Sequence, residues 1–98
     1  MDRQTFHASL NDTAPPPNIP LALQALWHAA KGDWHKAHDC AQAQEDRDGS
    51  WVHAHLHRQE GDLANASYWY RRAGKPTSND SIEAEWNAIV DALLPEPG

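Results

Sequence analysis

The sequence predicts an all-α protein, in which two antiparallel helix-turn-helix repeats follow a short N-terminal helix and precede a C-terminal capping helix. Three observations support this fold class. Apolar residues recur at helical spacing in several segments, a Gly-Asp pair interrupts the pattern twice, and the chain partly matches itself after a shift of 29 residues. Although only 40% of the residues are hydrophobic, five Trp, two Tyr and one Phe can each bury a large area. One modest core is therefore expected.

Residues 1–18 are predicted to form an N-terminal arm with a proline-rich connector, and residues 19–98 a single helical domain. Phe6 and Leu10 lie four residues apart, which is compatible with a short helix over residues 2–10. Between residues 11 and 20 the chain contains four prolines, which fix φ and remove hydrogen-bond donors. This stretch is expected to be extended.

The first repeat is expected to begin near Leu21, with Asn18 as a helix cap. Gly32 ends this first helix, and Asp33 caps a second one that ends before Gly49. The inward stripe of the first helix consists of Leu23, Leu26, Trp27 and Ala30. Because the turn between the two helices is so short, they must lie antiparallel.

The second half of the chain follows the same plan. Ser50 is expected to cap a third helix, Gly61 ends it, Asp62 begins the fourth, and Gly74 stops that helix. A final helix is predicted from its apolar stripe and from an acidic pair with the spacing of a capping box, Asp80 and Glu83. The stripe consists of Ile82, Trp86, Ile89, Val90 and Leu93.

The 29-residue shift superposes five identical pairs: Ala25 and Ala54, His28 and His57, Gly32 and Gly61, Asp33 and Asp62, Ala37 and Ala66. Over roughly residues 19–76 this pattern resembles the tetratricopeptide and Sel1-like class of helical-hairpin repeats. The residues that carry the resemblance are Ala25, Gly32, Asp33, Trp34 and Ala37, then Ala54, Gly61, Asp62, Leu63, Ala66, Tyr70 and Ala73. The resemblance implies binding of a peptide or a partner protein.

Composition excludes several classes of function. With 8 Lys and Arg against 14 Asp and Glu the net charge is −6, which opposes binding to nucleic acid or to an anionic membrane. The single cysteine, Cys40, cannot form an intrachain disulfide, and no leader-like segment opens the chain, so a cytoplasmic protein is expected. No nucleophile arrangement or phosphate-binding glycine loop is present, so the sequence predicts neither catalysis nor a cofactor.

The first functional hypothesis is therefore a non-catalytic protein-protein interaction module. Its partner is either another protein or a second copy of the chain, which would give a homodimer. Aromatic and guanidinium side chains are typical of interaction hot spots. The residues predicted to face the partner are Trp51, His55, Arg58, Tyr68, Arg71 and Arg72.

The alternative hypothesis is a metal-binding or metal-dependent protein. His53 and His57 lie four residues apart on one helical face and Glu60 follows three residues later, so together they can chelate a divalent transition ion, with His28 as a further ligand. The competing structural interpretation is that these histidines pack between helices as half-buried rings. Two other histidines, His35 and His38, are expected to face solvent.

Overall fold

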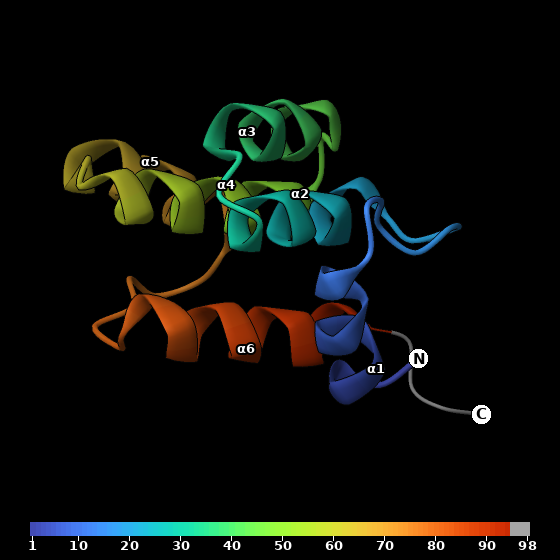
Figure 1. Ribbon diagram of the computed structural model, residues 1–98. Coiled ribbons are helices and arrows are strands. Elements are labelled where there is room, and N and C mark those ends of the chain that lie inside the picture. The colour runs from blue at the N-terminus through green and yellow to red at the C-terminus, as the bar shows by residue number, and fades with distance from the viewer. Residues whose placement is uncertain (95–98) are drawn as a thin grey trace.

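The computed structural model describes residues 1–94 and confirms the all-α fold class (Figure 1). Residues 95–98 of the predicted domain lie outside the described part. Within residues 1–94 the helices are α1 (Arg3–Ala8), the 3-10 turn η1 (Ser9–Asn11), α2 (Leu21–Ala30), α3 (Trp34–Ala43), α4 (Arg47–Glu60), α5 (Leu63–Ala73) and α6 (Ile82–Leu93). None of these helices combines the length and apolarity that a membrane span requires.

The helices lie in three tiers, with α4 at the centre of the packing (Figure 1). The upper tier is α3, which packs on α2 and α4, and the middle tier holds α2, α4 and α5, with α5 packed against α4. The lower tier is α6, which runs beneath α2 and α4 and meets α1 near the N-terminus. The face formed by α2 and α4 is therefore covered by the chain's own last helix.

The two Gly-Asp corners have the same local geometry. Gly32 and Gly61 both adopt left-handed conformations, with φ of 85° and 88°, which favour glycine because it has no Cβ. The carboxylates of Asp33 and Asp62 each accept a hydrogen bond from the backbone N–H three residues ahead, at 3.1 and 3.2 Å. Each corner thus ends one helix and starts the next, as the sequence predicts. The resemblance to tetratricopeptide or Sel1-like repeats stays a prediction.

Two predicted N-caps are wrong. Helix α4 begins at Arg47, where the Asp46 carboxylate accepts from the N–H of Gly49 at 2.9 Å, so Ser50 lies in the first turns of the helix. In α6 the cap is Ser81, whose hydroxyl accepts from Ala84 N–H at 3.0 Å, and Asp80 lies one residue before it. In both cases the capping oxygen is the one that reaches the N–H three residues ahead.

The cap at the start of α2 also differs from the prediction. Asn18 does not cap this helix; it occupies a left-handed turn with φ of 64°, and Pro20 stands at the cap position. Instead, the side chain of Gln44 at the end of α3 accepts from the N–H of Ala22 at 2.7 Å. A long-range contact therefore replaces the local cap, and local sequence patterns cannot reveal such a partner.

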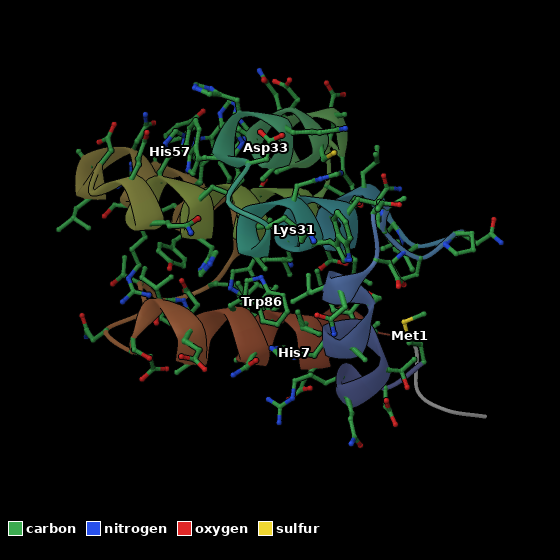
Figure 2. All side chains as sticks on the ribbon, in the orientation of Figure 1. Met1, His7, Lys31, Asp33, His57 and Trp86 are labelled. Carbon is green, nitrogen blue, oxygen red and sulfur yellow. The ribbon has the colours of Figure 1, made fainter. Side chains whose placement is uncertain are left out.

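The N-terminal segment is part of the core, so the predicted boundary at residue 18 does not separate an arm from the domain. Phe6 is fully buried, and its ring lies 5.9 Å from that of Trp86. Trp86 extends from α6 toward the α2 tier, as Figure 2 shows, and its indole N–H donates to the carbonyl of Leu26 at 2.8 Å. The other large fully buried apolar side chains are Leu23, Leu26, Leu56, Ile89, Val52 and Val90.

Candidate metal centre

Three histidines from two packed helices form one cluster. His53 and His57 lie one turn apart on α4, and His38 reaches them from α3, which packs on α4. Their ring centroids are separated by 4.5 Å for His38 and His53, 5.4 Å for His38 and His57, and 4.8 Å for His53 and His57. We call these three residues the histidine triad.

The triad can present one nitrogen from each ring to a common ion. Three such nitrogens lie within 4.8 Å of one another. With bonds of about 2.0–2.1 Å, a tetrahedral ion places its nitrogen ligands roughly 3.3 Å apart, so binding draws the rings together by at most about 1.5 Å.

Two indole rings hold the triad in place. Trp69 on α5 stacks on His53 with ring centroids 3.8 Å apart and planes inclined by 12°. Trp34 on α3 stacks on His38 at 5.0 Å and meets His57 edge-on at 5.9 Å. The indole N–H of Trp34 is itself fixed by the carbonyl of Leu56 at 2.8 Å. The rings are therefore oriented by packing before any ion arrives.

The electrostatic environment keeps lone pairs available on the triad. Burial, together with the neighbouring His38 and His57 rings, lowers the pKa of His53 to about 4. Burial and the nearby His57 ring also lower the pKa of His38. At neutral pH these two imidazoles are uncharged, which is the state that binds a metal ion.

Glu60 lies behind the triad. Its Oε1 is 2.7 Å from Nδ1 of His57, so the Nδ1 hydrogen is donated to the carboxylate and Nε2 remains to face an ion. Histidines that bind metals commonly donate their other ring N–H to a carboxylate, which fixes the tautomer and increases the basicity of the ligand nitrogen. With respect to the triad Glu60 positions a ligand, and its predicted role as a ligand stays a prediction, because His57, Glu60 and Asp62 form a second metal-compatible group among the described residues.

The structure brings together only part of the metal site predicted from the sequence. His53 and His57 belong to the cluster, but the third member is His38, which is half-buried against Trp34 and does not face solvent as predicted. His28 belongs to none of the metal-compatible groups found among the described residues. Local spacing could not find His38, because its proximity depends on how α3 packs on α4.

The residues predicted to bind a partner do not form one patch. Tyr68, Arg71 and Arg72 are exposed on α5, with a guanidinium N–H of Arg72 donating to the Tyr68 hydroxyl at 3.1 Å. His55, in contrast, is fully buried beneath α6.

Two other residues predicted to face a partner also have partners within the chain. Arg58 is largely buried and donates to Glu85 at 3.0 Å. Trp51 is half-buried, with the Lys75 ammonium 4.3 Å from its ring centroid. In this fold His55 and Arg58 serve internal contacts, because α6 covers their face of α4.

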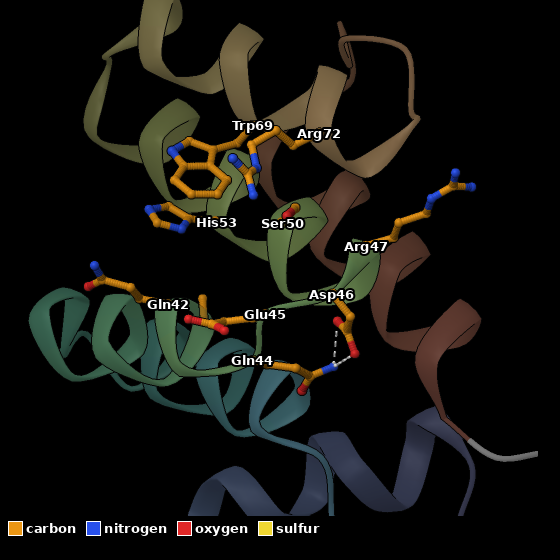
Figure 3. A pocket seen from close by; sticks show the side chains of 10 residues that line it. Gln42, Gln44, Glu45, Asp46, Arg47, Ser50, His53, Trp69 and Arg72 are labelled. Carbon is orange, nitrogen blue, oxygen red and sulfur yellow. Dashed lines mark hydrogen bonds between the residues drawn. The ribbon is translucent and has the colours of Figure 1, made fainter.

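A groove of about 610 Å³ opens beside the triad, between α3 and α5 (Figure 3). Figure 3 shows Gln42 of α3 and Glu45 of the following turn on one wall, Trp69 and Arg72 of α5 on the other, and His53 between the two walls. The guanidinium of Arg72 also lies 5.3 Å from the Trp69 ring centroid. One member of the triad thus borders a space that solvent or a small ligand can enter.

Comparisons with known proteins add no family to this description. The chain matches no protein-family model, no curated protein and no solved structure.

Proposed function

We propose that this protein binds one divalent transition-metal ion, of which zinc is the best fit, through the imidazoles of His38, His53 and His57. The observation that carries the proposal is the convergence of three imidazole nitrogens, within 4.8 Å of one another, from two different helices. Neutral imidazole suits zinc, copper and nickel, and the cluster contains no thiolate that would favour a softer ion. With three protein ligands the fourth position of a tetrahedral ion stays free.

Three further features support metal binding. The Glu60 carboxylate sets the tautomer of His57. Lowered pKa values keep His38 and His53 neutral at pH 7. Stacking on Trp34 and Trp69 limits the rotation of the His38 and His53 rings. Less side-chain conformational entropy is therefore lost when a metal ion binds.

Calorimetric titration with zinc chloride, on protein purified without a histidine tag, tests the proposal. We expect one ion per chain, and His38→Gln should weaken zinc binding by more than about a hundredfold because a ligand is lost. The matched control is His35→Gln, which removes an exposed histidine three residues away on the same helix and should leave the affinity unchanged. Absence of saturable binding, or equal losses in the two variants, would contradict a site at the triad.

A second candidate function is self-association through the outer face of α5. Tyr68 is 43% exposed, the guanidinium of Arg72 donates to its hydroxyl at 3.1 Å, and Arg71 lies three residues after Tyr68 on the same side of the helix. A second copy offers complementary charge, because the chain carries −6 overall and its exposed acids include Glu83 on α6. We propose a homodimer that uses this face.

Sedimentation equilibrium over a range of concentrations tests self-association. Tyr68→Ser should weaken the dimer by about tenfold, since an aromatic contact side chain contributes on the order of 1–2 kcal/mol. Leu21→Ser is the control, because Leu21 is also exposed but lies on α2. A chain that stays monomeric at every concentration, or variants that behave alike, would rule out the dimer.

A further inference from the structure

Trp34 bridges the two helices that supply the histidine triad. It is the first residue of α3, and its ring stacks on that of His38 with centroids 5.0 Å apart and planes inclined by 20°. The same indole meets the ring of His57, on α4, at 5.9 Å with planes inclined by 62°. Trp69, by comparison, stacks on one triad ring, that of His53. Trp34 therefore contacts two of the three proposed ligands, and these two come from different helices.

The indole of Trp34 is anchored on both helices. Its N–H donates to the carbonyl of Leu56 at 2.8 Å, one residue before His57 on α4. On α3 it lies four residues before His38, so these two side chains are neighbours on one helical face. Because the indole is held by both helices, the position of His38 relative to His57 depends on Trp34.

The donor atoms of the triad do not by themselves select one ion. Neutral imidazole suits zinc, copper and nickel, so selectivity among these ions depends on geometry. Zinc is bound tetrahedrally, whereas copper(II) and nickel(II) favour square-planar or tetragonal sets of ligands. The arrangement of the three rings therefore decides which ion fits best.

The three rings form a nearly equal-sided triangle, with centroid separations of 4.5, 4.8 and 5.4 Å. Three corners of a tetrahedron are equally spaced, whereas in a planar set one pair of ligands lies about 1.4 times as far apart as the other two pairs. The longest separation in the triad is only slightly larger than the other two, so the triangle fits a tetrahedral ion better. His38 supplies the corner from α3, which is the corner that Trp34 holds.

We propose that Trp34 determines the metal specificity of the triad, by holding His38 at the third corner of a tetrahedral set and so favouring zinc over nickel. This inference rests on the proposed zinc site and deepens it. Without the indole, His53 and His57 remain one turn apart on α4, but His38 loses both the stacked ring and the link to Leu56. The site then approaches a pair of histidines that leaves its other positions to water, and such a pair does not distinguish the two ions by geometry.

Separate calorimetric titrations with zinc chloride and nickel chloride, on the whole protein purified without a histidine tag, test this inference. Trp34→Leu removes the indole but keeps an apolar side chain, and it should weaken zinc binding by about 10–100-fold, the usual effect of losing a group that orients a ligand. Nickel binding should weaken far less, so the ratio of the two affinities changes. Trp51→Leu is the matched control, because it removes a half-buried indole of α4 that faces Lys75, and it should leave the ratio unchanged.

Cobalt(II) provides a second measurement, which a general loss of stability would not change. This ion absorbs visible light strongly in a tetrahedral set of ligands and weakly in an octahedral set. The parent protein should show the strong absorption. Trp34→Leu should still bind cobalt at higher concentrations but with lower absorption per bound ion, whereas Trp51→Leu should keep the parental spectrum.

Circular dichroism establishes whether the variants are folded. If Trp34→Leu does not fold, Trp34→Phe takes its place, because it keeps a ring against His38 but has no N–H for Leu56; it should show a smaller loss of zinc preference in the same direction. An unchanged ratio of zinc to nickel affinity, or a parental cobalt spectrum in the Trp34 variant, would overturn the role of Trp34 and leave the zinc site standing. A parent that binds neither zinc nor cobalt would overturn the proposed function and this inference with it.

Discussion

Among single residues, Glu85 shows how a charged side chain can occupy the apolar side of a helix. It lies three residues after Ile82 and four before Ile89, so helical geometry turns it toward the core, where it is 4% exposed. The sequence pattern alone places this carboxylate on the buried stripe. It does not reveal the partners, because His55 and Tyr70 come from helices whose packing on α6 is a tertiary property. Burial also raises the pKa of Tyr70, which therefore remains a donor to Glu85.

His53 should make the stability of the metal-free protein depend on pH. Its pKa is about 4 in the folded chain and about 6.5 when unfolded, so the unfolded state takes up the proton first as the pH falls. The stability that the neutral His53 contributes to the folded state is therefore complete above pH 6.5, and it is lost as the pH falls toward 4. The difference corresponds to about 3 kcal/mol in the free energy of unfolding.

Urea denaturation in EDTA at several pH values measures this dependence. Between pH 6.5 and 4.5 the free energy of unfolding of His53→Gln should fall less steeply than that of the parent, because the variant has no imidazole to protonate at this position. His35→Gln, at an exposed position on α3, should keep the parental slope. Parallel slopes for all three proteins would mean that protonation of His53 does not contribute.

At the level of helices, α3 and α4 meet through an unusually close backbone contact. A Cβ placed on Gly49 would lie 1.8 Å from the carbonyl oxygen of Gln44 and 3.1 Å from that of Ala41. The second helix does end before Gly49, as the sequence predicts, because α3 ends at Ala43; Gly49 itself belongs to the next helix. It lies inside the first turn of α4, where the end of α3 packs against it.

Gly49→Ala should therefore destabilise the protein by about 3 kcal/mol, because backbone atoms rather than a flexible side chain must move. Gly61→Ala is the comparison: its Cβ meets nothing within 4 Å, but its φ of 88° costs about 1 kcal/mol for an L residue. Urea unfolding of the two variants measures both losses. A smaller loss at Gly49 than at Gly61 would contradict the close contact.

Helix periodicity was sufficient to predict most of the helices but not the site. Apolar spacing and the Gly-Asp corners locate α2, α3, α5 and α6 to within a few residues, because these signals are local. The caps of α2, α4 and α6 were predicted wrongly, since several nearby polar residues could serve and the tertiary fold selects among them. His38 was missed for the same reason, because its neighbours come from another helix.

Across the whole molecule, the core joins segments from both ends of the described chain. Phe6 of α1 and Trp86 of α6 pack against each other, and Trp86 is hydrogen-bonded to Leu26, which lies 60 residues earlier. Helix α6 packs on both α2 and α4 and covers the face that they share. A partner therefore has no access to the face of α2 and α4 that α6 covers.

This arrangement has a consequence for biosynthesis. Chains emerge from the ribosome N-terminus first, so α1 to α5 are translated before the helix that covers α2 and α4 exists. Until α6 leaves the exit tunnel, the apolar underside of α2 and α4 lacks its cover and Phe6 has no indole to pack against. The nascent protein must therefore complete its core after, and not during, translation of the first five helices.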